Sequence, residues 1–186
     1  MSQQYLYSFF TTEDLSKKME DIEVVKMLAG YATKEMVNTQ CYSGQTPLEL
    51  IEYGKDYSAL LVKILLNAHA DVKTHYLSYA KDSATWELFV RYYMSKGIEN
   101  NTYDPSGYTP LYYIIRKDLL LAAKLLECWK NKAEQDGLKY RLLYALQEQM
   151  PNGFPVLDIN FLAHCEYNRM PGTQELRNVY MKILYG

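Results

Sequence analysis

Hydrophobic residues recur at three- and four-residue intervals along most of this chain, which predicts amphipathic helices and not strands. The clearest runs are Leu60–Leu66, Trp86–Met94 and Leu120–Leu126. Turn-forming or polar residues separate one run from the next, and no run is long enough to cross a bilayer. The pattern therefore predicts an all-α protein built from short helices joined by short loops.

Two segments of the chain spell the same pattern, Ser-Gly-x-Thr-Pro-Leu. They are Ser43–Leu48 and Ser106–Leu111, and each leads through a first apolar run into a second one. Glycine takes a positive φ easily and so suits the turn. Threonine is a good N-cap, and proline fits the first helical position because its missing N–H has no helical partner there. Each copy predicts a turn, a first helix, a loop and a second helix.

The first copy resembles an ankyrin repeat over its whole length. Thr46-Pro47-Leu48, then Leu61–Leu66 and then Ala68–Val72 look like the TPLHLA, VVKLLL and GADVN segments of that family. His69 stands where the family has a left-handed glycine, and histidine tolerates that conformation better than most residues. The resemblance implies an ankyrin-repeat-like helical solenoid of about four to five helix-turn-helix units, of which two are clear and the rest degenerate.

The units of this single domain, residues 1–186, follow from aligning the copies. Thr46 and Thr109 lie 63 positions apart, which accommodates two unequal units of about 33 residues. The expected units are approximately 11–40, 41–73, 74–101 and 102–130, an irregular helical segment 131–150 and a degenerate C-terminal cap 151–186. Within them we expect helices at 12–18 and 22–28 in the first unit, at 77–81 and 86–94 in the third, at 138–149, and at 158–167 and 174–185 in the cap.

Composition narrows the possible functions. The 186 residues are 48% hydrophobic and 23% charged, with a net charge of −2. A nearly neutral chain has no field to gather nucleic acid or anionic membrane, so we expect neither as a partner. Three widely spaced cysteines indicate free thiols, and the N-terminal residues lack the pattern of a secretory signal. We therefore expect a monomer in the cytoplasm.

A search for catalytic or metal-binding groups finds little. The chain has no glycine-rich phosphate loop and no CxxC or HxxxH pair, so we expect no cofactor and no metal site. His164 and Cys165 are adjacent, but neighbours on a helix point about 100° apart and cannot act together as base and nucleophile. An enzyme that uses Cys165 or His164 in the C-terminal segment remains the alternative to a protein without catalytic activity.

The resemblance to ankyrin repeats implies binding through a concave face made of turn tips and the exposed sides of the first helices. Tyrosine, which recognition surfaces favour, is unusually common in the chain, with 19 copies against five phenylalanines and two tryptophans. Compositional bias alone is the competing explanation of that excess. The expected partner-binding positions are Gln40, Tyr42, Ser43, Gln45, Glu52 and Tyr53 in the first copy, and Tyr103, Asp104, Pro105, Ser106, Tyr108, Tyr112, Arg116 and Lys117 in the second.

The expected function is therefore that of an interaction protein that binds another protein and blocks, recruits or stabilises it. Short, degenerate ankyrin-like proteins with irregular spacing resemble those of intracellular bacteria and of large DNA viruses. The lack of an F-box-like C-terminal ending favours a bacterial effector, which would act in the cytosol of a host cell.

Overall fold

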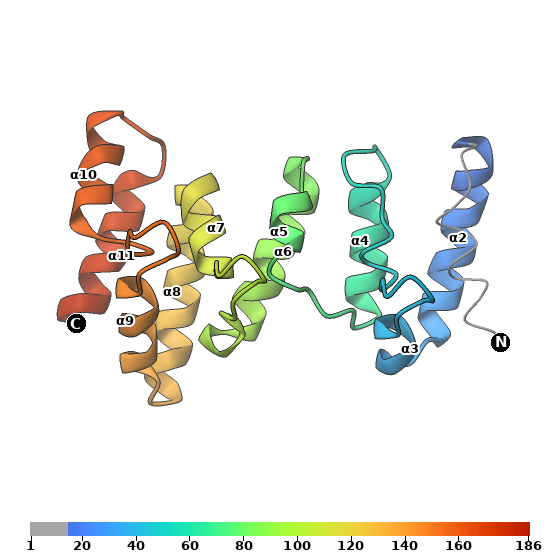
Figure 1. Ribbon diagram of the computed structural model, residues 1–186, viewed down its shortest axis with the longest axis horizontal. Helices are drawn as coiled ribbons and strands as arrows, with labels where there is room; N and C mark the ends of the chain where they lie inside the picture. The colour runs from blue at the N-terminus through green and yellow to red at the C-terminus, as the bar shows by residue number, and fades with distance from the viewer. Residues whose placement is uncertain (1–14) are drawn as a thin grey trace. The chain divides into compact units, whose positions relative to one another are not determined.

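The protein is mostly helical in its computed structural model, which describes the backbone from Leu15 and the side chains from Ile22 to the C-terminus (Figure 1). This confirms the all-α class. Apart from an isolated bridge between Gln149 and Pro155, no β-pairing occurs in the described part. The helices are α2 (Leu15–Tyr31), α3 (Lys34–Asn38), α4 (Ser58–Asn67), α5 (Tyr76–Tyr79), α6 (Ser83–Lys96), the 3-10 helix η1 (Ile98–Asn100), α7 (Pro110–Lys117), α8 (Leu119–Gln135), α9 (Lys139–Gln147), α10 (Ile159–Tyr167) and α11 (Thr173–Tyr185).

The chain divides into two compact units. The first contains the residues up to Val72 together with Tyr79–Leu88, and the second contains Lys73–Ser78 together with Phe89–Gly186. Helix α6 begins in the first unit and ends in the second. Its residue Trp86, in the first unit, is buried.

In the first unit, α2 packs against α4. The prediction of two helices at 12–18 and 22–28 is wrong, because α2 runs unbroken from Leu15 to Tyr31. The physical reason is that Met19, Glu20 and Asp21 include no glycine or proline that would end a helix. The expected helix start at Thr11 or Thr12 lies outside the described residues.

The helix expected after Thr46 is also wrong, because the chain makes only a single turn there. The amide of Leu50 donates to the carbonyl of Thr46 at 3.2 Å, and α4 does not begin until Ser58. The Ser58 hydroxyl donates to the carbonyls of Glu52 and Lys55 and accepts from the Lys55 amide, which ties the intervening loop to the start of α4. A well-organised loop therefore replaces the rest of the first helix.

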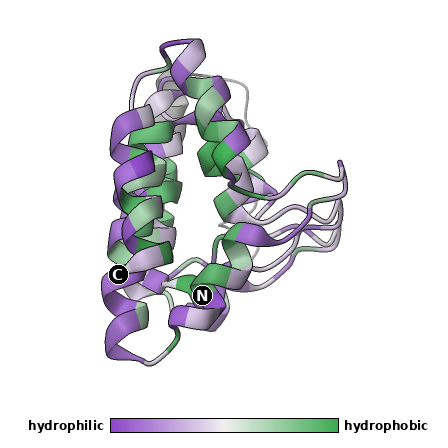
Figure 2. Ribbon diagram, turned by 90° about the vertical axis from the view of Figure 1, so that its left-hand side faces the viewer, coloured by the Kyte–Doolittle hydropathy of each residue, from purple (hydrophilic) through white to green (hydrophobic). Residues whose placement is uncertain are grey.

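The second unit has the more regular helix pairs. Asp118 joins α7 to α8: its amide donates to the Ile114 carbonyl at the end of α7, and its carboxylate accepts from the Leu121 amide at the start of α8. The core is centred on Trp129, which is fully buried and donates its indole N–H to the Tyr93 carbonyl at 2.8 Å. Viewed from the side of α10 and α11, hydrophobic residues lie mainly where helices face one another (Figure 2).

Most of the other predicted helices are confirmed within a few residues. The predicted spans 86–94 and 138–149 correspond to α6 and α9, and 158–167 and 174–185 correspond to α10 and α11. The degenerate span 77–81 holds only the four-residue α5. His69 has a φ of 68°, as expected for a residue in place of glycine at the end of α4.

Three tip loops share one hydrogen-bonding pattern. They are residues 41–45, 104–108 and 150–154, and in each the first amide donates to the fifth carbonyl while the fourth amide donates to the first carbonyl. The fourth residue is Gly44, Gly107 or Gly153, and each has a φ near 80°. A side chain with a Cβ rarely adopts this φ. The two predicted Ser-Gly turns are therefore confirmed, and Gly153 makes a third turn of the same kind.

Candidate functional site

The tip loop 104–108 of the second unit is held from inside by a carboxylate. Asp104 is only 9% exposed. Its carboxylate accepts from the Ser106 and Tyr108 amides at 2.8 and 2.9 Å and from the Tyr113 hydroxyl at 2.7 Å. Burial alone would raise the pKa of Asp104, but these bonds hold it below its usual value. Asp104, one of the expected partner-binding positions, therefore stabilises the loop itself, because three donors depend on its carboxylate.

Tyrosine rings form a cluster between this loop and α7. Tyr108 stacks on Tyr112 with ring centroids 4.6 Å apart, and both rings meet Tyr113 edge to face at about 6 Å. Burial, and then the bond to Asp104, raise the pKa of Tyr113. Because offset stacks and edge-to-face pairs stabilise one another, Tyr108 and Tyr112 have fixed orientations while remaining partly exposed.

The neighbouring tip loop 150–154 lies directly against this cluster. A Cβ built on Gly107 would approach Pro151 Cγ to 2.8 Å, so only glycine permits the two loops to meet this closely. Asn152 donates its side-chain amide to the Tyr112 hydroxyl at 3.1 Å. Phe154 is 65% exposed at the end of tip loop 150–154. The two tips and α7 therefore form one continuous aromatic surface.

Arg116 packs against Tyr112 of this cluster and against Phe161 of α10. Its guanidinium lies 4.0 Å from the centroid of Phe161 and 5.3 Å from that of Tyr112, and it donates to the Pro155 carbonyl at 3.4 Å. Cation–π contacts on two rings hold the side chain against the protein. Arg116, one of the expected partner-binding positions, therefore packs on two rings and makes one hydrogen bond within the unit while remaining partly exposed.

The remaining predicted positions divide into exposed and structural ones. Tyr53 is half-buried, donates its hydroxyl to the Leu48 carbonyl at 2.8 Å and packs beside Tyr79, so it also serves the fold. Tyr42 is fully exposed at the first tip. The others that reach solvent are Gln40, Ser43, Gln45, Glu52, Tyr103, Pro105, Ser106 and Lys117.

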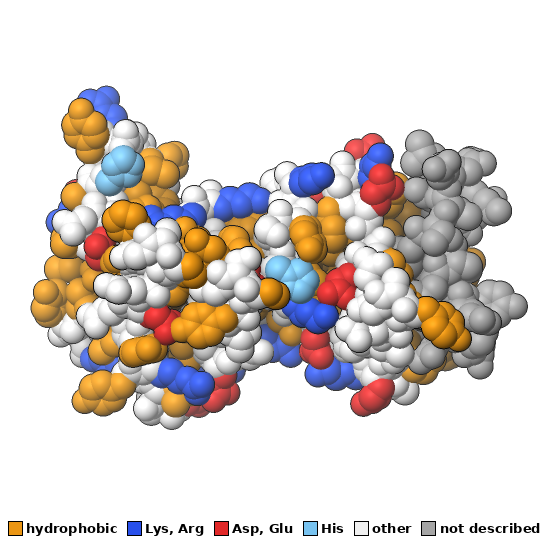
Figure 3. Space-filling view, viewed as in Figure 1, with side chains coloured by type: hydrophobic (Ala, Val, Ile, Leu, Met, Phe, Trp, Pro, Cys, Tyr) orange, Lys and Arg blue, Asp and Glu red, His pale blue; other side chains and the backbone are white. Residues whose placement is uncertain are grey.

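Sequence reasoning missed three exposed aromatic residues of the second unit. Tyr140 and Tyr144 on α9 are 86% and 66% exposed, and Phe154 belongs to the third tip. On the face shown in Figure 3, hydrophobic side chains gather over α7 and α9. A four-residue spacing of tyrosines on an expected helix was available as a signal. Residues 131–150 do not resemble a repeat, so the repeat register does not mark these two positions.

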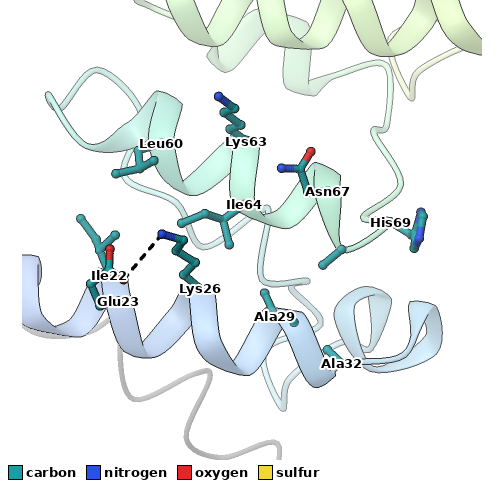
Figure 4. A pocket seen from close by; sticks show the side chains of 12 residues that line it. Ile22, Glu23, Lys26, Ala29, Ala32, Leu60, Lys63, Ile64, Asn67 and His69 are labelled. Atoms are coloured by element: carbon teal, nitrogen blue, oxygen red, sulfur yellow. Dashed lines mark ion pairs between the residues drawn. The ribbon is translucent and has the colours of Figure 1, made fainter.

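A groove of about 490 Å³ lies between α2 and α4 in the first unit (Figure 4). Its floor is apolar and includes Ile22, Ala29 and Ile64. Lys26 points toward α4 but pairs with Glu23 of its own helix at 3.7 Å, whereas Lys63 points away from α2. The lining has the chemistry of a shallow packing groove, without a pair of titratable groups aimed at one point.

The alternative catalytic residues are poorly placed for chemistry. Cys165 is fully buried, and burial raises the pKa of its thiol, against a smaller opposing effect of Arg116. A buried thiol with a raised pKa is a weak nucleophile. His164 is exposed, and its ring nitrogens lie 3.2 and 3.4 Å from the Asn168 amide nitrogen. This arrangement does not pair the imidazole with the thiol.

Over the residues that the structure describes, no three His, Cys, Asp or Glu side chains come together as metal ligands. Within the same part of the chain, no helix is both long enough and apolar enough to span a bilayer. Comparisons with protein-family models, with curated proteins and with solved structures returned no match.

Proposed function

We propose that the protein is an interaction module of the ankyrin type that binds a partner protein through its tip loops and the exposed side of α7. The observation that supports this best is the continuous surface of tips 104–108 and 150–154, with the Tyr108–Tyr112 stack between them. Aromatic residues with fixed orientations provide contact area at little cost in side-chain entropy, which is why interfaces favour tyrosine.

The surface also has the division of roles that a binding module needs. Asp104 and Gly107 maintain the loops from inside, and solvent-facing positions such as Pro105 and Phe154 are left for contact. Because the loop hydrogen bonds are made by the backbone and one buried carboxylate, the exposed side chains can change without loss of the loop. A role as an effector in the cytosol of a host cell is part of the same proposal.

The test is capture of proteins from cell lysates by the immobilised chain, identified by mass spectrometry. The Tyr108→Ser and Phe154→Ser double variant should lose the captured partner, because it removes aromatic contact from both tips. The matched control is Tyr167→Ser with Tyr185→Ser, which removes two exposed rings from α10 and α11. Thermal unfolding of each variant checks that the fold is kept. Retention of the partner by the tip variant, or its equal loss from the control, would contradict the proposal.

A further inference from the structure

A second group of tyrosines in the second unit lies on the same stretch of chain as a carboxylate. Tyr140 and Tyr144 lie four residues apart on α9, and Glu148 follows after four more as the C-cap. Residues with this spacing share one side of a helix. Both tyrosines are mostly exposed, and Glu148 is half-exposed. The stripe therefore presents two phenol rings and one carboxylate to solvent.

Tyr103 completes the group from the neighbouring loop. It is 56% exposed, and its hydroxyl donates a hydrogen bond to the Glu148 carboxylate. This bond, and then desolvation, raise the pKa of Tyr103 to about 12. Tyr144 lies four residues before Glu148 and therefore on the same side of α9. The bond fixes the Tyr103 ring at one end of the stripe, where Tyr103 remains exposed and Glu148 half-exposed.

The group is electronegative and has no cation of its own. Among the residues that the structure describes, no lysine or arginine pairs with Glu148; the nearest along α9, Arg141, pairs with Glu99 at 3.7 Å. The last turn of α9 contains no basic residue. A helix C-terminus carries a partial negative charge, and the faces of phenol rings are also negative. The Glu148 carboxylate, the C-terminus of α9 and the faces of the phenol rings thus each favour a positively charged group at this end of α9.

We propose that these residues bind an arginine side chain of the partner protein, with the guanidinium at Tyr103, Tyr144 and Glu148 and the aliphatic stem toward Tyr140, about 12 Å from Glu148 along α9. The proposal rests on the proposed function and names the chemistry that the partner would supply. Arginine fits better than lysine because its planar guanidinium stacks on aromatic rings and donates in a fork to a carboxylate at the same time. Tyr140, Tyr144 and Glu148 belong to α9 and its C-cap, Tyr103 precedes tip 104–108, and the capture experiment changes none of these four residues.

The probe is the blocked pentapeptide Gly-Gly-Arg-Gly-Gly, titrated into the full chain and followed by NMR through the tyrosine ring protons. We expect shifts at Tyr103, Tyr140 and Tyr144, and much weaker ones with glutamine in place of arginine. Glu148→Gln and Tyr144→Leu should each weaken binding by about three- to tenfold, the size expected for one charge-assisted or cation–π contact.

The matched control is Glu175→Gln, which removes the same charge from an exposed carboxylate at the start of α11. It should leave the affinity unchanged. Equal weakening by Glu148→Gln and Glu175→Gln, equal binding of the glutamine peptide, or the absence of shifts at the three rings would each overturn the arginine site. If lysate capture still depends on Tyr108 and Phe154 in that case, the proposed function stands and only the arginine site is wrong.

Discussion

The two copies of Thr-Pro-Leu begin alike and continue differently. Thr109 caps α7, an eight-residue helix, whereas Thr46 begins a single turn. The shorter copy has the better start: Thr46 and Glu49 form a reciprocal capping box, with bonds of 2.7 and 3.4 Å, while Thr109 makes one bond of 3.4 Å to the Tyr112 amide. Start signals therefore do not decide how far these helices extend.

Burial along the helix explains the difference. Leu111, Ile114 and Ile115 are fully buried at the i, i+3 and i+4 positions of α7. In the first copy Leu48 and Ile51 are buried, but the position of Ile115 is occupied by the exposed Glu52. Short helices depend on packing for most of their stability. Because Glu52 leaves the first copy one buried position short of α7, the first copy does not hold a second turn.

The largest loss of stability should come from replacing Ile115 of the second copy with glutamate, the residue that the first copy has at the equivalent position, Glu52. Ile115→Glu removes a buried side chain worth about 2–5 kcal/mol and places a carboxylate in the core, so we expect the free energy of unfolding to fall by at least that amount. Urea unfolding followed by far-UV circular dichroism measures it. Lys117→Glu, at the exposed end of the same helix, is the control. Similar stability of Ile115→Glu and the wild type would refute the burial explanation.

Replacing Asp104 should cause the next largest loss of stability. Asp104→Ala leaves the Ser106 and Tyr108 amides and the Tyr113 hydroxyl without their acceptor, which should lower the free energy of unfolding by about 2–3 kcal/mol.

The lowered pKa of Asp104 also predicts a pH dependence. The unfolded value is near 3.8 and the folded value is below it, so the contribution is complete above about pH 5 and is lost as the pH falls through the folded value. Between pH 5 and pH 2 the wild type should therefore lose more stability than Asp104→Asn. Parallel pH profiles for the two proteins would contradict this.

Gly54 tests the loop that replaces the missing helical turns. It has a φ of 90°, and the second copy has Lys117 at the corresponding position. Gly54→Ala should lower the free energy of unfolding by about 1 kcal/mol because alanine is strained at this φ. Gly30→Ala, in α2 and with open space around the added methyl group, is the control and should not destabilise. Unchanged or greater stability of Gly54→Ala would show that the first copy can extend its helix after all.

The smallest expected change in stability concerns Cys41 in tip loop 41–45. Cys41 occupies the position of Asp104 in the first loop, where its thiol contacts the Ser43 hydroxyl at 2.9 Å. Cys41→Asp should supply an acceptor for the loop amides and raise the melting temperature slightly at neutral pH. Cys41→Asn, which has the same shape with less acceptor strength, should raise it less. A lower melting temperature for Cys41→Asp would mean that the two tips are not equivalent.

The sequence predicted the elements whose signals are local. The Ser-Gly turns, the Asp158–Tyr167 helix and the positive φ of His69 each depend on residues within a few positions, and they were found. The single turn after Thr46 was not found, because Thr46-Pro47-Leu48 indicates where a helix begins and contains no information on whether Glu52 and Tyr53 are buried in the fold. Helix length here is decided by tertiary packing.

The same limit applies to the candidate site. Exposed tip residues such as Tyr42 and Pro105 could be placed from the repeat register alone. The buried carboxylate of Asp104 and the stacked Arg116 could not, because their partners Tyr113 and Phe161 are identified only by distance in the fold. The Tyr103–Glu148 bond joins residues 45 positions apart and had no local signal.

The buried indole of Trp129, bonded to the Tyr93 carbonyl, has a practical consequence. The chain contains two tryptophans, and the boundary between the compact units assigns Trp86 to one and Trp129 to the other. Indole fluorescence responds to polarity and to hydrogen bonding, so Trp86→Phe leaves an optical reporter in the second unit and Trp129→Phe leaves one in the first. The unfolding of each unit can therefore be recorded as a separate emission signal, without any added label.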